Sequence, residues 1–366
     1  MTSSEPSYQL NQAGLRFPEM LTFSITGSCN LTCSHCWVRA GEGSSPGNVP
    51  LGTVRRIMAD FAAIGGEGIR ITGGEPLCHP HWLEILQFSV SLCFKKVILQ
   101  TNAMLMNSEQ IDSLHKLDFP GLTLQISLDG VSPLTHDPVR GEGAFSGALQ
   151  GIEMLVQAGL GPRIAIFCTE MGHNLEEIPP LLDFADRMGI GSVSTGAIVM
   201  CGRATESALV APPALEQYLR LLERYDEDAH FRDVYARLGT VAALEWYNGE
   251  SIRVECCSFI ENPYLTPQGR LYPCLMCHAD EYSVVRVFEK GLLLAIAEGV
   301  PLWSSLQRLS HCRSDQVTEC RYCPLKACCG GGCMGRARGS FGDFMVADDR
   351  CTLRKAIYQH KLSRLH

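Results

Sequence analysis

Between residue 19 and about residue 200, short apolar runs alternate with longer segments in which apolar residues recur every three or four positions. Short runs of this kind are typical of buried strands, and the longer segments are typical of helices that cover them. The predicted strands are 20–26, 68–72, 96–101, 123–128, 163–169 and 192–198, and the predicted helices are 51–64, 82–91, 108–116, 143–158 and 175–188. Six strand–helix units predict an α/β fold with a parallel sheet that forms a partial barrel.

The pattern changes in the last third of the chain. Residues 210–247 are predicted to be helical, and short irregular segments rich in glycine and cysteine follow them. Such segments bury too little apolar surface to be ordered without metal. We therefore expect an amino-terminal extension at 1–18, a partial barrel at 19–209, a helical bridge at 210–250 and a small cysteine-rich module at 251–366.

Composition narrows the classes of function. The 366 residues include 31 basic and 39 acidic ones, a net charge of -8 that argues against a nucleic-acid partner. No apolar run is long enough to span a bilayer and no export signal precedes the first strand, so we expect a cytoplasmic protein without a membrane partner. Eighteen cysteines in such a chain indicate metal ligation rather than disulfides.

Three cysteines form a compact motif. Cys29, Cys33 and Cys36 stand in a C-x3-C-x2-C arrangement directly after the first predicted strand, at the end of the sheet where ligands bind. Three thiolates on one loop can hold three irons of a four-iron cubane and leave the fourth iron open to a ligand. The alternative is a zinc knuckle completed by His35 or by a distant cysteine.

The loop SITGSCNLTCSHCW resembles the cluster loop of the radical SAM superfamily, in which the open iron binds the methionyl amine and carboxylate of S-adenosyl-L-methionine. His35 occupies a position that is often aromatic in that family. The family's GGEP motif is similar to a segment that follows the second predicted strand. The resemblance implies that this segment, Gly73, Gly74, Glu75 and Pro76, receives the methionyl ammonium.

Two further segments carry the same resemblance. Ser127 and Asp129, in the sequence SLDG, close the fourth predicted strand, and the family uses this strand end to contact the ribose or carboxylate of the cofactor. Arg140 lies in a stretch that resembles H-D-x-x-R-G and is a candidate for the methionyl carboxylate, because a guanidinium grips a carboxylate at two points. A surface salt bridge is the other interpretation of Arg140.

The carboxy-terminal cysteines resemble the SPASM pattern, which in the family holds two auxiliary [4Fe-4S] clusters. The resemblance implies that one group of ligands is Cys320, Cys323, Cys329 and Cys351, and that the group nearer the barrel is Cys257, Cys274 and Cys333. The fourth ligand of the nearer cluster is not assigned. It is Cys256, Cys277 or Cys312, or the fourth iron has no protein ligand. Two structural zinc sites are the alternative for this module.

The resemblance implies three [4Fe-4S] clusters and a radical SAM oxidoreductase that generates a 5'-deoxyadenosyl radical. The expected substrate is a peptide or protein side chain, modified by oxidation, a thioether or a carbon–carbon crosslink, as in a maturase of a ribosomally made peptide. An electron donor such as flavodoxin or ferredoxin is implied. Two alternative reactions are sulfatase maturation and tetrapyrrole modification. Sulfatase maturation is doubtful because sulfatase-maturing enzymes have an aspartate at the position of Leu275. A non-catalytic metal-binding scaffold is an alternative from another class. No catalytic acid or base is identified.

Overall fold

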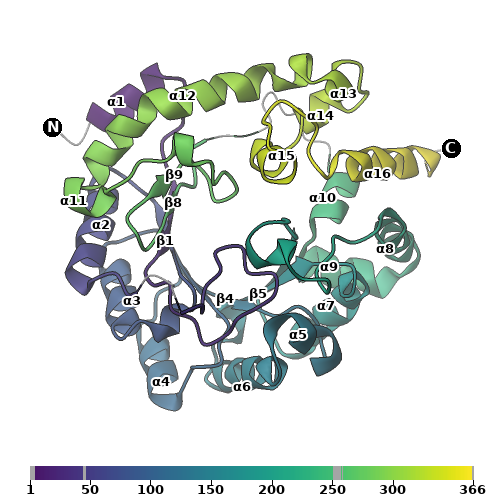
Figure 1. Ribbon diagram of the computed structural model, residues 1–366. Coiled ribbons are helices and arrows are strands. Elements are labelled where there is room, and N and C mark those ends of the chain that lie inside the picture. The colour runs from purple at the N-terminus through teal and green to yellow at the C-terminus, as the bar shows by residue number, and fades with distance from the viewer. Residues whose placement is uncertain (1–4, 44–46, 250–256, 258, 365–366) are drawn as a thin grey trace. The chain divides into compact units, whose positions relative to one another are not determined.

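The computed structural model describes residues 5–43, 47–249, 257 and 259–364 (Figure 1). The chain forms two compact units. Unit 1 contains Met1–Ser28, Gly43–Leu99 and Ser251–Cys351, and unit 2 contains Cys29–Glu42, Gln100–Glu250 and Thr352–His366. Within the described part of the chain, no helix has both the length and the apolar character needed to cross a membrane.

The sheet of unit 1 has the strand order β3-β2-β1-β8-β9. Its strands are β1 (Met20–Ser24), β2 (Gly68–Thr72), β3 (Lys96–Thr101), β8 (Tyr264–Leu265) and β9 (Leu271–Tyr272). The first three are parallel, β8 adds to β1 in parallel, and β9 returns antiparallel to β8. The predictions for β2 and β3 match the structure residue for residue, whereas the two-residue strands β8 and β9 are too short to give a periodic signal.

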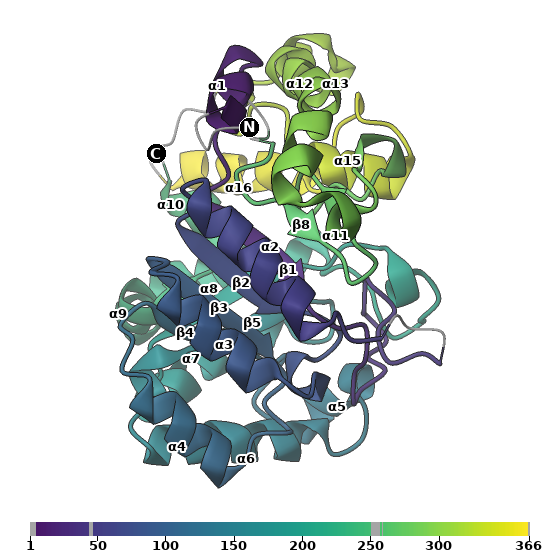
Figure 2. The ribbon, with the colours of Figure 1, turned by 90° about the vertical axis from the view of Figure 1, so that its left-hand side faces the viewer.

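One face of this sheet is apolar. Leu21, Phe23, Ile69 and Ile71 alternate with polar residues along β1 and β2 and are fully buried. Figure 2 shows α2 lying along β1 and β2, with α3 beside it. The helices of unit 1 are α1 (Glu5–Gln12), α2 (Leu51–Ala63), η1 (Pro76–Cys78), α3 (Trp82–Ser91), η5 (Asp280–Tyr282), α11 (Val287–Lys290), α12 (Leu292–Gln316), α13 (Thr318–Arg321), α14 (Lys326–Cys329) and α15 (Met334–Phe341).

The expectation of only short irregular segments after residue 251 is wrong for α12, a helix of 25 residues (Figure 1). Ala295, Ile296, Trp303 and Leu306 are buried along it, so this helix supplies the apolar core that the prediction attributed to metal alone. Pro301 lies inside the helix and interrupts the sequence signal, because proline lacks the N–H of the helical ladder.

Unit 2 contains four parallel strands in the order β4-β5-β6-β7. They are β4 (Leu122–Ser127), β5 (Ile164–Glu170), β6 (Ser192–Ala197) and β7 (Gly239–Thr240). The helices are α4 (Ser108–Lys116), α5 (Pro133–Arg140), α6 (Ala144–Gln157), η2 (Gly161–Arg163), η3 (Leu175–Glu177), α7 (Ile178–Arg187), η4 (Gly202–Thr205), α8 (Leu215–Glu227), α9 (Ala229–Leu238) and α10 (Ala242–Asn248), followed at the end of the chain by α16 (Cys351–Ser363). The strand–helix alternation predicted for residues 108–198 is therefore present.

The predicted helical bridge is divided into three helices and a short strand. Asp228 ends α8 and caps α9 by accepting a hydrogen bond from the N–H of Phe231 (3.0 Å). Gly239 then begins β7, which pairs with β6, before α10 starts. The segment thus adds a strand to the sheet of unit 2 rather than forming one continuous helix.

Candidate functional site

The three cysteines of the predicted cluster loop lie in the segment 29–42 of unit 2, where backbone N–H groups point at two of their sulfurs. The N–H of Leu31 donates to the Sγ of Cys29, and the N–H of Ala40 donates to the Sγ of Cys36, both at 3.4 Å. Such donors favour the thiolate form, which is the form that ligates metal. Burial raises the pKa of the Cys33 thiol, and the positive charge of Arg140 opposes that rise.

A second segment clasps this loop. Arg203, in η4 after β6, donates to the carbonyl oxygens of Cys33 (2.8 Å) and Ala40 (2.9 Å) and to the carboxylate of Glu42 (3.1 Å). The N–H of Arg203 also donates to the carbonyl of Cys36 (3.1 Å). The preceding Gly202 has a φ of +59°, and a Cβ there would lie 2.5 Å from the same carbonyl. Sequence spacing did not identify this clasp.

Asp129 and Arg140 form a buried pair of opposite charges in the same unit as the cluster loop. Arg140 Nε donates to Asp129 Oδ2 at 2.6 Å, and the two side chains are 8% and 0% exposed. The other carboxylate oxygen of Asp129 accepts from the N–H of Thr169 (2.8 Å). Burial alone would raise the pKa of Asp129, but the adjacent Arg140 guanidinium holds that pKa well below its usual range. Arg140 therefore belongs to a buried ion pair, and the alternative of a surface salt bridge is wrong.

His35 faces the same carboxylate. Its Nε2 lies 3.8 Å from Asp129 Oδ2, and burial together with the charge of Arg140 lowers the pKa of His35 to about 4. Its Nδ1 is buried and has no hydrogen-bond partner among the residues described. A buried, unsatisfied ring nitrogen costs about 1–3 kcal/mol, so a polar ligand is expected to meet it. Ser127 ends β4, half-buried and in register with Phe167 of β5.

The predicted GGEP segment lies in unit 1 and packs against the residues that precede Cys29. The N–H of Gly74 donates to the carbonyl of Thr26, and that of Glu75 donates to the carbonyl of Ser28, both at 2.8 Å. A Cβ on Gly73 would lie 2.6 Å from the carbonyl oxygen of Thr26, and one on Gly74 would lie 2.3 Å from that of Ser28. Only glycine fits here, which explains the pair physically.

Glu75 and Pro76 complete this segment. Glu75 is 1% exposed and its Oε1 accepts from the N–H of Leu77 (3.1 Å), while Pro76 starts η1 where a missing N–H is harmless. The segment is thus a rigid cradle of backbone groups with one buried carboxylate.

Some of the carboxy-terminal thiols of unit 1 interact with one another. Cys257 and Cys333 share a hydrogen bond, and the charges of neighbouring thiolates couple Cys333 to Cys274. In the other group, burial and the neighbouring thiolates of Cys351, Cys329 and Cys323 raise the pKa of Cys320 to about 11. In the part of the chain that the structure describes, no three acidic, histidine or cysteine side chains converge as they would on a single metal ion.

Of the candidates for the fourth ligand of the nearer cluster, Cys277 is described by the structure and interacts with Cys274 and Cys333. It is buried, and burial together with the thiolates of Cys274 and Cys333 raises its pKa to about 12. Cys312 instead directs its thiol at the carbonyl of Leu309 (3.5 Å), and Cys256 lies outside the described residues. The N–H of Met276 donates to Cys274 Sγ (3.4 Å), in the same two-residue pattern as at Cys29. This donor set suits an iron–sulfur cluster.

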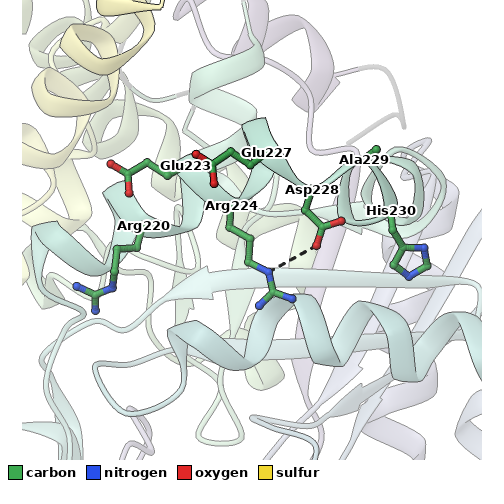
Figure 3. A pocket seen from close by; sticks show the side chains of 7 residues that line it. All are labelled: Arg220, Glu223, Arg224, Glu227, Asp228, Ala229 and His230. Atoms are coloured by element: carbon green, nitrogen blue, oxygen red, sulfur yellow. Dashed lines mark ion pairs between the residues drawn. The ribbon is translucent and has the colours of Figure 1, made fainter.

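A depression of the surface at α8 and α9 is unrelated to these groups (Figure 3). It is lined by exposed charged residues such as Arg220 and Glu223, and Arg224 pairs with Asp228 at 3.8 Å. None of the site residues predicted from the sequence lines it.

Known proteins match this chain over most of its length. Residues 23–185 match the model of the Radical SAM superfamily. The AdoMet-dependent heme synthase of Methanosarcina barkeri is 25% identical over 92% of this chain and 97% of that protein. The mycofactocin maturase MftC of Mycobacterium ulcerans is 27% identical over 88% of this chain and 84% of that protein.

A solved structure shares the fold. Native anSMEcpe with bound AdoMet and Cp18Cys peptide superposes with a TM-score of 0.72 at 16% identity, over 95% of this chain and 98% of that one. This likeness confirms the predicted partial-barrel fold with its cysteine-rich carboxy-terminal part. Residues 23–185 therefore form a radical SAM domain, and along its length the chain is similar to enzymes of the SPASM type.

Proposed function

We propose that this enzyme uses Cys29, Cys33 and Cys36 to hold a [4Fe-4S] cluster that binds S-adenosyl-L-methionine. The observation that carries the proposal is the clasped loop, in which one short segment supplies three cysteines and Arg203 fixes the carbonyls beside them. When bound, the cluster and S-adenosyl-L-methionine supply a 5'-deoxyadenosyl radical, which abstracts a hydrogen atom from the substrate.

The chain's own residues bind and orient the cofactor. The cradle Gly73–Pro76 offers backbone groups and the Glu75 carboxylate to a methionyl ammonium. Asp129 and Arg140 hold each other in a fixed geometry, so Arg140 has only its remaining N–H groups for a carboxylate. His35 offers its buried Nδ1, and Ser127 stands at the strand end beside this network.

The carboxy-terminal thiols are proposed to hold two auxiliary clusters. Cys257, Cys274, Cys333 and Cys277 form the nearer site, and Cys320, Cys323, Cys329 and Cys351 form the other. Oxidation of a substrate radical releases one electron, and clusters at these thiols would accept it. A flavodoxin or ferredoxin is the proposed electron donor.

A peptide or protein is the proposed substrate, as for a maturase of ribosomally made peptides. The similarity to a maturase and to a fold that binds a peptide in anSMEcpe supports this choice. A tetrapyrrole is the second candidate, because the relative with the broadest mutual coverage of those compared is a heme synthase.

The test is an anaerobic assay of the reconstituted protein with S-adenosyl-L-methionine and dithionite. We expect 5'-deoxyadenosine and methionine in equal amounts, together with about 12 iron atoms per chain for three clusters. The triple variant Cys29→Ala, Cys33→Ala, Cys36→Ala should lose this product. The matched control Cys93→Ala, which removes an exposed thiol, should retain it. A wild-type protein that holds iron and forms no 5'-deoxyadenosine contradicts the proposal.

A further inference from the structure

The last turn of α12 carries a fully buried arginine, Arg313. Its Nε donates to the carbonyl of Gly331 at 2.9 Å, and one terminal nitrogen, Nη2, donates to the carbonyl of Val346. The other terminal nitrogen, Nη1, is buried and has no hydrogen-bond partner among the described residues. Within the same residues, no acidic side chain forms an ion pair with this guanidinium.

This arrangement leaves the charge of Arg313 without an anion. Burying a guanidinium is strongly unfavourable unless the charge is both hydrogen-bonded and paired. The two carbonyl oxygens satisfy two of its nitrogens, but they carry no net charge. The side chain therefore lacks an anionic acceptor at Nη1.

The partners of Arg313 come from the segments that carry one of the two groups of predicted cluster ligands. We call this group the distal group; it consists of Cys320, Cys323, Cys329 and Cys351. Gly331 follows Cys329 by two residues, and Val346 precedes Cys351 by five. The Arg313 guanidinium thus joins the segment after Cys329 to the segment before Cys351.

The backbone of Arg313 holds a third segment, the start of α13, which adjoins the end of α12 (Figure 1). Its carbonyl accepts from the N–H of Val317 (2.9 Å), and the carbonyl of Val317 accepts from the N–H of Cys320 (3.0 Å). Gly331 permits the close approach on the other side, since it has a φ of +96° and a Cβ there would lie 3.1 Å from Arg313 Cγ. One residue therefore organises all three segments of the distal group.

The charge of Arg313 also acts on the distal thiols. Burial and the neighbouring thiolates raise the pKa of Cys320, and the positive charge of Arg313 opposes that rise. This opposition means that the guanidinium attracts the Cys320 thiolate. Four thiolates around an iron–sulfur core carry a net negative charge. A cluster at the distal group is thus the anion that Arg313 lacks.

The arginine beside the nearer group is already paired. Arg336 Nε donates to Asp349 Oδ1 at 2.7 Å, and this carboxylate raises the pKa of Arg336 against the effect of burial. The thiolate of Cys333 acts on the same guanidinium. A second carboxylate, that of the buried Asp348, accepts from the N–H of Cys333 at 2.7 Å. Carboxylates therefore offset the positive charge near the nearer thiols.

These surroundings affect reduction of the two groups in opposite directions. Reduction adds one negative charge to a cluster, and a positive neighbour in a buried site favours the reduced form. A hydrogen bond donated to a cluster sulfur has the same effect. The unpaired guanidinium at the distal group should therefore make that cluster the easier one to reduce.

We propose that Arg313 is a positioning residue of the distal auxiliary cluster: its Nη1 donates to that cluster, and its charge gives the cluster a higher reduction potential than the nearer one. The inference rests on the proposed function, which assigns a cluster to each group of thiols. One electron shared between the two clusters then resides on the distal one. The nearer cluster is oxidised and the distal cluster is reduced, and no proton moves.

The test is a redox titration of the reconstituted full chain, followed by electron paramagnetic resonance. The chain carries Cys29→Ala, Cys33→Ala and Cys36→Ala, so that only the auxiliary clusters contribute. We expect two one-electron steps at different potentials. Adding Cys323→Ala should remove the step at the higher potential, and adding Cys274→Ala should remove the step at the lower potential.

Substitution of Arg313 in this chain tests the cause of the difference. Arg313→Gln should lower only the higher potential, changing the ratio of reduced to oxidised distal cluster by about tenfold or more, a shift of about 59 mV for one electron. Arg313→Lys keeps the charge and should shift this potential less. The matched control is Arg308→Gln, which removes the same charge from an exposed position of α12, where solvent screens it, and should change neither potential.

Iron counting separates the holding role from the electrostatic one. If Arg313→Gln binds about four fewer iron atoms, Arg313 is needed to hold the cluster, and Arg313→Lys should then retain the iron and the higher potential. Loss of the lower step in Cys323→Ala, or a shift in Arg313→Gln no larger than in Arg308→Gln, overturns this inference alone. A chain that binds no iron after the three replacements in the first loop overturns the proposed auxiliary clusters as well.

Discussion

Replacing Arg203 tests how the cluster loop is held. One guanidinium, 12% exposed, bonds to the carbonyls of Cys33 and Ala40 and to Glu42. Hydrogen bonds from a charged donor contribute about 1.5–3 kcal/mol each, and the bond to the partly exposed Glu42 adds little. Arg203→Gln should therefore lose about 3 kcal/mol of loop ordering, a factor of about 100 in the ratio of closed to open loop. We expect faster loss of the first cluster.

The assay follows the electron paramagnetic resonance signal that changes when S-adenosyl-L-methionine is added, during incubation with an iron chelator. Arg203→Lys keeps the charge and should retain more of this signal than Arg203→Gln. The matched control is Arg232→Gln, since Arg232 also donates to two backbone carbonyls, those of Tyr225 and Asp226, away from the cysteines. Equal retention in Arg203→Gln and Arg232→Gln would refute the clasp. A lower reduction potential in Arg203→Gln would further show that its charge acts on the cluster.

Three further predictions concern the cradle, the ion pair and the nearer thiols. Gly74→Ala should abolish binding of S-adenosyl-L-methionine in calorimetry, because its Cβ would meet the carbonyl of Ser28 at 2.3 Å, whereas Gly52→Ala in α2 meets no atom within 4 Å and should bind normally. Asp129→Asn should lower stability by about 3–5 kcal/mol by leaving Arg140 buried and unpaired. Since the pKa of Asp129 is held below its unfolded value of about 4, this loss should be equal in thermal melts at pH 5 and pH 8. It should shrink only below pH 4, where the unfolded chain takes up a proton that the folded Asp129 does not. Cys277→Ala should reduce the iron bound per chain while Cys312→Ala should not; the reverse result would assign Cys312 as the ligand.

Local patterns were sufficient for much of the fold. We could predict the buried strands β2 and β3 and the helices between strands because residues close together in the chain show the apolar periodicity of strands and helices. Prolines concealed other elements. Pro138 lies within α5 and Pro301 lies within α12, so these helices are held by tertiary packing where local propensity is poor.

The sequence by itself identified the candidate residues for the chemistry, since cysteine spacing on one loop and glycine pairs at a strand end depend on neighbours in the chain. Tertiary structure alone decided which distant residues support them. Arg203 meets Cys33 across 170 positions, and Arg140 meets Asp129 only after α5 turns back. Such partners are set by strand order and register, for which one sequence carries no local signal.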